Sequence, residues 1–243
     1  MNIITSDVNI PNQDLLIKSF LAHPEDNTHP LPAVIVVQEI FGVNDHIKDV
    51  TCRLAKEGYV AIAPAIYQRQ APNFSAGYTS KDIEIGRVYK NQTKAAELLS
   101  DIQSTINYLY QLPYVKKTGV GTIGFCFGGH VVYLTATLSD IRVTASFYGA
   151  GITNWCPNEK NATITKTKDI KGKIWCFFGE KDASIPLEQV SSIELELQKH
   201  NIDHQIFTYP NADHGFFCDR RGSYHEQSAK DAWDKVLRLF KNL

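Results

Sequence analysis

The sequence predicts an α/β fold in which a mostly parallel β-sheet carries helices on both faces. Short runs of β-branched residues, such as Ala33–Gln38, are typical of strands covered on both sides. Segments with apolar residues three or four positions apart, such as Glu97–Leu112, are typical of helices with one buried side. The two kinds of segment alternate along the chain, which favours parallel strands joined by helical crossovers.

The chain is expected to begin with one early strand. Asp14–Ala22 places successive side chains on opposite faces, as a strand does. His23–Pro32 is polar and contains prolines, so it is expected to be a loop. Ala33–Gln38 is a continuous apolar run between turn signals and predicts a strand buried on both faces.

A helix and a second buried strand are expected next. Asn44 or Asp45 can cap a helix that Gly58 ends. Tyr59–Ala63 is then a short buried strand. Glu97–Leu112 has its apolar residues on one helical face and predicts a long helix.

The middle of the chain predicts a strand, a helix and two further strands. The expected strand Gly119–Gly124 leads directly into a helix that starts at Phe127. Val143–Tyr148 and Lys173–Phe178 follow as buried strands. The carboxyl ends of such strands are where ligands bind in open parallel sheets, so residues just after each strand are functional candidates.

The last quarter of the chain completes the pattern. Pro186 is expected near the first position of a helix, where its missing N–H costs nothing. His204–Tyr209 is the last expected strand, and apolar residues from Ala229 to Phe240 predict a final amphipathic helix. Two stretches, Gln68–Lys81 and Asn154–Lys168, are expected to be loops over one face.

Composition is typical of a soluble globular protein with one domain spanning residues 1–243. The 243 residues are 43% hydrophobic and 21% charged, with a net charge of −1. This balance gives no electrostatic reason to expect nucleic acid or an anionic membrane as a partner. The sequence has neither a secretory signal pattern nor an apolar run of the roughly 18 residues that span a bilayer.

The five cysteines favour free thiols in the cytoplasm. Their number is odd and no C-x-x-C pair occurs, so neither a disulfide framework nor a zinc ribbon is indicated. There is no H-E-x-x-H motif and no spaced Cys/His cluster, so no metal site is expected, and no cofactor is implied.

The segment around Cys126 carries the strongest chemical signal. Gly124-Phe-Cys126-Phe-Gly128 joins an expected strand to an expected helix and matches the G-x-nucleophile-x-G elbow, with Cys in place of Ser. Such a turn exposes the nucleophile at a helix N-terminus, where the helix dipole favours the thiolate. The alternative for a lone cysteine is a small buried hydrophobe, but the glycine frame favours a nucleophile.

Chain order suggests the partners of this nucleophile. In this type of hydrolase the nucleophile is followed by an acid and then by a histidine. Asp182 and His214 each follow an expected strand, in that order. A turn aspartate and a surface histidine are the alternatives, and Asp213 is a rival acid. Adjacent residues rarely orient each other's side chains, so Asp182 is preferred.

Several motifs together resemble those of the dienelactone hydrolase family. They are Gln38-Glu-Ile-Phe-Gly-Val43, Tyr67-Gln-Arg-Gln-Ala-Pro72, Gly124-Phe-Cys-Phe-Gly-Gly129 and the segments of Asp182 and His214, in the same order and with similar spacing. The resemblance extends from about Asp14 to the C-terminus. It implies an α/β-hydrolase fold, a Cys–His–Asp triad and a small ester or lactone as substrate.

The resemblance also implies roles for three other residues. Glu39 is implied to contact the resting cysteine and to help deprotonate it when substrate arrives. The backbone N–H groups of Ile40 and Phe127 are implied to form the oxyanion hole.

The positions that bind the substrate carboxylate in the family differ here. The family has an Arg shortly after the catalytic histidine, where this chain has Cys218, with Arg220 and Arg221 a little further on. A second family Arg corresponds to Ile85, with Arg87 two residues later. Because Arg binds carboxylates with a bidentate fork, Arg220 and Arg221 are candidate substrate-binding residues.

These observations together predict a hydrolase that cleaves a small carboxylic ester or lactone. Two alternatives remain from the sequence. A thiol-based sensor or binding protein on the same scaffold would have an oxidisable Cys126 without turnover. A cysteine peptidase or amidase could use the same elbow.

Overall fold

The chain is built around one eight-stranded sheet, seen in a computed structural model that describes residues 1–26 and 28–243. The strands lie in the order β1-β2-β4-β3-β5-β6-β7-β8. Their bounds are β1 Ile3–Asn12, β2 Leu15–Pro24, β3 Leu31–Val37, β4 Val60–Pro64, β5 Val115–Phe125, β6 Ile141–Phe147, β7 Lys173–Gly179 and β8 His204–Tyr209. Neighbours from β4 to β8 pair in parallel, whereas β1–β2 and β2–β4 pair antiparallel. The predicted mostly parallel α/β sheet is therefore confirmed.

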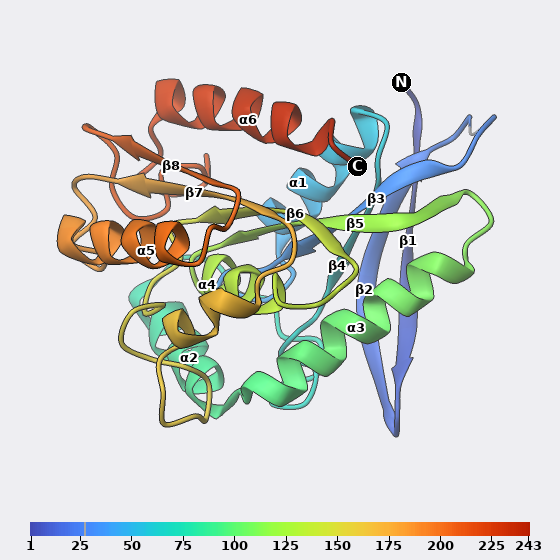
Figure 1. The fold of residues 1–243 in the computed structure, drawn as a ribbon. Helices are drawn as coiled ribbons and strands as arrows, with labels where there is room; N and C mark the ends of the chain where they lie inside the picture. The colour runs from blue at the N-terminus through green and yellow to red at the C-terminus, as the bar shows by residue number, and fades with distance from the viewer. Residues whose placement is uncertain (27) are drawn as a thin grey trace.

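Helices cover both faces of this sheet. The helices are α1 Asp45–Lys56, α2 Ser80–Gln92, α3 Ala95–Gln111, α4 Phe127–Thr135, α5 Leu187–Lys199 and α6 Glu226–Phe240, with a 3₁₀ helix η1 at Thr163–Asp169. Figure 1 shows α1 and α6 on one face and α3 and α4 on the other. All residues of β3 from Ala33 to Val37 are buried, which explains the unbroken apolar run in the sequence.

Strand β1 and helix α2 are among the elements not expected from the sequence. Strand β1 precedes the one early strand that was predicted, and it lies at the sheet edge with most of its side chains exposed. Helix α2 fills the segment before the long helix, and Gly86 alone is buried along it. An element that buries few side chains has no clear apolar periodicity, so pattern analysis missed both.

Local signals set several boundaries. The Asn44 side chain accepts a hydrogen bond from the N–H of Ile47 at 3.3 Å, so Asn44 rather than Asp45 caps α1. Gly58, with φ +92°, follows the end of that helix as expected. The loop expected at Asn154–Lys168 is irregular only up to Thr163, where η1 begins.

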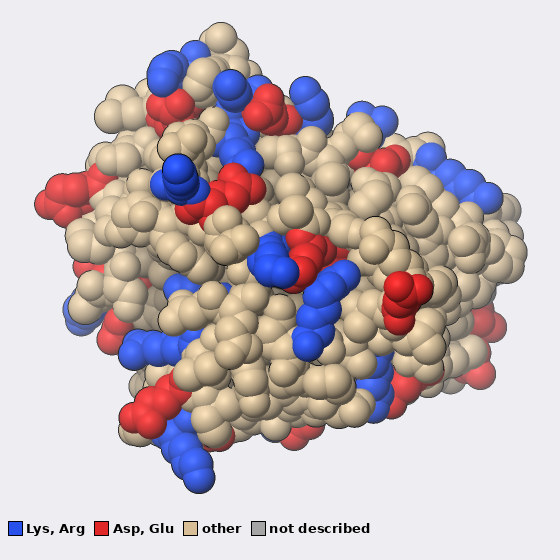
Figure 2. Space-filling model, turned by 90° about the horizontal axis from the view of Figure 1, so that it is seen from below, with Lys and Arg blue, Asp and Glu red and all other residues tan. Residues whose placement is uncertain are grey.

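Surface and thiol properties complete the description. None of the helices in the described part of the chain combines the length and apolar content needed to cross a bilayer. On the face in Figure 2, basic and acidic side chains are interspersed. All five cysteines are free thiols.

Candidate active site

Cys126 lies on a sharp turn between β5 and α4. Its backbone has φ 55° and ψ −116°, a conformation that a residue with a side chain rarely adopts and that costs on the order of 1–3 kcal/mol. A Cβ at Gly124 would lie 2.1 Å from the carbonyl oxygen of Gly128, and a Cβ at Gly128 would lie 2.3 Å from that of Val37. Only glycine fits at either position, as the sequence motif predicts. Cys126 remains partly exposed rather than sealed in the core.

The carboxyl ends of β7 and β8 bring an acid and a histidine together. Asp182 follows β7, His214 follows β8, and His214 Nδ1 lies 2.7 Å from Asp182 Oδ2. The Asp182 side chain is fully buried, and its Oδ1 accepts a hydrogen bond from the N–H of Ser184 at 2.8 Å. These contacts hold the carboxylate against the imidazole. By contrast, Asp213 is exposed, and its Oδ1 accepts a hydrogen bond from the backbone N–H of His214 at 2.6 Å.

His214 lines the same cavity as Cys126. Burial disfavours the imidazolium, but the charge of a Cys126 thiolate and the bond to Asp182 outweigh it, so the pKa of His214 rises to about 10. An imidazole placed between a thiol and a buried carboxylate can accept the thiol proton and keep it. The raised pKa of His214 favours its protonated form when a negative charge lies on Cys126.

Glu39 follows β3 and is buried beside the same residues. Its Oε1 accepts a hydrogen bond from Arg221 Nη1 at 2.9 Å, while its Oε2 is buried without a hydrogen-bond partner in the described structure. Burial raises the pKa of Glu39, and the nearby charges of Arg221 and His214 oppose that shift. Glu39 is thus a buried carboxylate whose second oxygen is available to a proton or a ligand group.

The structure separates the two candidate arginines. Arg221 lies in the site, with its guanidinium 5.8 Å from the ring centre of Phe41 and bonded to Glu39. Arg220 points to the exposed carboxylate of Asp45 at 3.4 Å. Gly215 makes room for Arg221, since a Cβ at residue 215 would lie 2.4 Å from Nη1 of Arg221.

A cavity of about 360 Å³ opens above Cys126. Its size is at the lower end for small-molecule sites, which suits a compact ligand. It is lined by Ile40, Phe41, Ile83, Arg87, Lys90, Cys126, Phe127, Ala150, Ser184, His214 and Arg221. Ile40 and Phe127 both line this cavity, and Phe127 is the first residue of α4, so its N–H has no acceptor within that helix.

Helix α2 contributes part of the wall that the sequence analysis did not assign. Ile83, Arg87 and Lys90 all face the cavity from this helix. The Lys90 ammonium lies 4.5 Å from the ring centre of Trp155, and burial lowers the pKa of Lys90. Because α2 was not predicted, the helical spacing that places these residues on one side could not be used to find them.

A group of side chains that could hold a metal ion lies at a different place. His46, Cys218 and Asp219 each present one ligand atom, and these atoms lie within 4.8 Å of one another. No motif in the sequence indicates this group, because His46 and Cys218 lie far apart in the chain.

Known proteins resemble this chain along nearly all of its length. The profile of the dienelactone hydrolase family matches residues 17–243. A Synechocystis protein provisionally named carboxymethylenebutenolidase is 56% identical over 241 residues, covering 99% of this chain and 98% of its own. An Escherichia coli K12 protein with the same provisional name is 33% identical, covering 98% and 87%.

A solved structure agrees with these relatives. A provisionally assigned dienelactone hydrolase from Klebsiella pneumoniae has a TM-score of 0.91 and 33% identity, and the match covers 100% of both chains. The similarity thus extends to the whole fold and to the segments that surround Cys126. This chain therefore belongs to the dienelactone hydrolase family, has the α/β-hydrolase fold and is a hydrolase of the ester or lactone type.

Proposed function

We propose that this protein hydrolyses a small carboxylic ester or lactone that carries an anionic group, with Cys126 as nucleophile, His214 as base and Asp182 as the acid that orients His214. The observation that carries the proposal is the position of His214, which lines one cavity together with Cys126 and whose Nδ1 lies 2.7 Å from Asp182 Oδ2. We also propose one catalytic domain over residues 1–243 and retain a cytoplasmic location as part of the proposal.

The proposed reaction has two halves. His214 takes the thiol proton, and the Cys126 sulfur forms a bond to the substrate carbonyl carbon. As the tetrahedral intermediate collapses, the carbon–oxygen bond to the leaving alkoxide breaks and the imidazolium protonates that oxygen. Water, deprotonated by His214, then cleaves the thioester and releases the acid. In a lactone both products are parts of one hydroxy acid. Asp182 fixes the His214 tautomer and stabilises the imidazolium.

The oxyanion is proposed to bind the backbone N–H groups of Ile40 and Phe127. Both residues line the cavity next to Cys126, and the free N–H at the start of α4 supports this role. Glu39 is proposed to act as a second proton acceptor near the thiol, because its Oε2 is buried without a partner among the described residues. The hydrogen bond between Glu39 and Arg221 would be replaced by one between the substrate anion and Arg221.

The substrate class follows from the charges on the cavity wall. Arg87, Lys90 and Arg221 face a small cavity whose remaining wall is largely apolar. A carboxylate or similar anion would bind there with charge-assisted hydrogen bonds, and Arg221 offers the bidentate geometry. Arg220 is no longer part of the proposal, because its side chain pairs with Asp45 outside this cavity.

The decisive experiment compares wild type with Cys126→Ala on a chromogenic short-chain ester. The variant should keep less than about a tenth of the wild-type kcat, because no other group on the turn can replace the thiolate. Intact-mass analysis after an acid quench should show an acyl adduct on wild type and none on Cys126→Ala. Equal thermal unfolding of both proteins is the control for folding.

Each alternative predicts a different result. A thiol sensor or binding protein would show no turnover in the wild type. An amidase or peptidase would cleave amides at rates like those on matched esters. A Cys126→Ala variant that retained wild-type kcat would contradict the covalent mechanism itself.

A further inference from the structure

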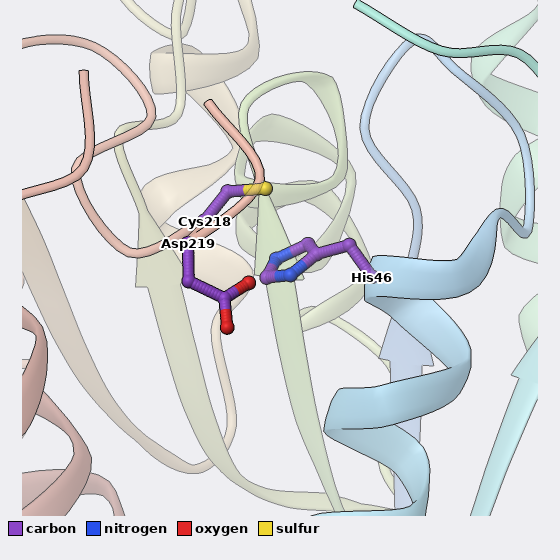
Figure 3. Close-up of side chains that lie close together, drawn as sticks. All are labelled: His46, Cys218 and Asp219. Carbon is purple, nitrogen blue, oxygen red and sulfur yellow. The ribbon is translucent and has the colours of Figure 1, made fainter. Parts of the chain in front are cut away.

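We propose that His46, Cys218 and Asp219 form a binding site for a divalent metal ion of the zinc type, separate from the Cys126 thiol. Figure 3 shows the three side chains facing one another, His46 from the start of α1 and the other two from the loop that follows the β8 strand. One ligand atom from each lies within 4.8 Å of the others. The proposal is independent of the proposed hydrolytic function.

The unusual state of His46 is the second observation that points to a ligand. The side chain is 1% exposed, yet neither ring nitrogen has a hydrogen-bond partner within the described structure. Buried polar groups are nearly always paired with protein or water, so an imidazole with two free nitrogens needs an explanation. A metal ion between this ring and the two neighbouring ligand atoms would supply the missing partner.

The donor set has the composition of a zinc site. Thiolate, imidazole and carboxylate are the three ligand types that zinc accepts, and three protein ligands leave a fourth position for water. Metal–ligand bonds of about 2.0–2.3 Å require the ligand atoms to move about 1 Å closer together. Asp219 is exposed and has the freedom to make this adjustment.

Metal binding at this site accounts for the proton of the Cys218 thiol and for the charge of the ion. The Cys218 thiol donates a hydrogen bond to the hydroxyl oxygen of Tyr78 at 3.3 Å in this structure. As the sulfur–metal bond forms, the thiol proton passes to water, and the Tyr78 hydroxyl can then donate to the thiolate. One thiolate and one carboxylate together neutralise the two positive charges of the ion.

An ion can approach this site from the surface. His46 and Tyr78 line a hollow of about 360 Å³, and Asp219 lines a second hollow of about 260 Å³. Cys218 lies on the short loop between His214 and Arg221. Its carbonyl oxygen accepts a hydrogen bond from the backbone N–H of Arg221 at 3.1 Å. A bound ion would therefore fasten this loop to the N-terminal end of α1.

The test is metal binding by metal-free protein, with Zn²⁺ measured by competition against a chromogenic chelator and Co²⁺ measured by its thiolate charge-transfer band. Wild type and Cys126→Ala should each bind one ion with the same affinity. Cys218→Ser should weaken binding at least about a hundredfold, because loss of an outer-shell partner alone costs ~10–100-fold. The exposed substitution Asp219→Asn should weaken binding without affecting the fold, and Cys52→Ser is the control for a thiol outside the group.

Two results would overturn the proposal. One is an absence of stoichiometric binding in the wild type. The other is binding that survives Cys218→Ser but disappears in Cys126→Ala, which would place the ion at the catalytic thiol. Circular dichroism of each metal-free variant separates loss of binding from loss of folding, and a metal-dependent rise in Tm is expected only where all three ligands are present.

Discussion

Arg221 Nη1 lies 2.9 Å from Glu39 Oε1, although 182 residues separate the two in the chain. The ion pair ties the loop after β3 to the loop after β8 and places a guanidinium beside Cys126. The absence of a side chain at Gly215 is what allows this position, because a Cβ there would meet the guanidinium at 2.4 Å. The guanidinium that lines the cavity with Cys126 is thus that of Arg221.

This relationship predicts different effects for the two neighbouring arginines. Arg221→Gln should lower kcat/KM for a carboxylate-bearing lactone by about 10- to 100-fold relative to a matched neutral ester, since a charge-assisted contact is worth ~1.5–3 kcal/mol. Arg220→Gln is the control. It should leave kcat/KM unchanged for both substrates, because that side chain pairs with exposed Asp45. Steady-state kinetics on the substrate pair provides the measurement. Equal small losses on both substrates in Arg221→Gln would show that the residue does not select acids.

The two aspartates near His214 should differ sharply in importance. Asp182→Asn should reduce kcat by on the order of a thousandfold, because an amide in place of the buried carboxylate favours the wrong His214 tautomer. Asp213→Asn should have little effect, since its carboxylate contacts only the backbone N–H of His214. The comparison uses kcat on one ester with all three proteins. A larger loss in Asp213→Asn would contradict the assignment.

Glycine at residue 128 should be indispensable. In Gly128→Ala the new Cβ would lie 2.3 Å from the carbonyl oxygen of Val37 and 2.5 Å from that of Gln38, so backbone must move. We expect a loss of at least about 1–3 kcal/mol in unfolding free energy. Activity should also fall, because Glu39 and Ile40 follow Val37 and Gln38 in the chain and would move with that backbone. Gly222→Ala is the matched control, with no atom near its new Cβ. Denaturant unfolding should leave the control unchanged, and equal stability of both variants would refute the steric argument.

His130 should make the free energy of unfolding depend on pH. Its Nδ1 donates to the carbonyl oxygen of Ala150 at 2.9 Å, and its Nε2 lies 2.7 Å from the hydroxyl oxygen of Thr163. Burial, opposed by the Ala150 bond and aided by the charge of Lys90, lowers the pKa of His130 to about 4 from 6.5. Between these values the unfolded chain binds more protons than the native one, so stability falls as pH drops from 6.5 to 4.

The expected contribution of His130 is about 3 kcal/mol over that range, because each tenfold change in proton affinity is worth about 1.36 kcal/mol. Unfolding free energies of wild type and His130→Gln at pH 7 and pH 4.5 give the slope for each protein. The variant should lose less stability on acidification, whatever its stability at pH 7. Identical losses in the two proteins would exclude His130 as the titrating group.

The geometry of the elbow could be predicted from the sequence because its cause is local. A strand that turns directly into a helix leaves no room for a Cβ at Gly124 or Gly128, and the residue between them must be exposed at the helix start. The buried strands and the amphipathic helices were likewise evident, since each has a regular period of apolar residues. The order of Asp182 and His214 in the chain, each after an expected strand, also allowed both to be placed at the carboxyl ends of strands.

Tertiary structure decided what depends on contacts between distant segments. Arg220 and Arg221 are indistinguishable by sequence, and only the fold turns one into the cavity and the other toward Asp45. Helix α2 and strand β1 bury too little to leave an apolar period, although α2 supplies Lys90 to the cavity wall. His46 and Cys218 meet because α1 and the loop after β8 are neighbours in space, and a sequence pattern cannot contain a distance that exists only after the chain has packed.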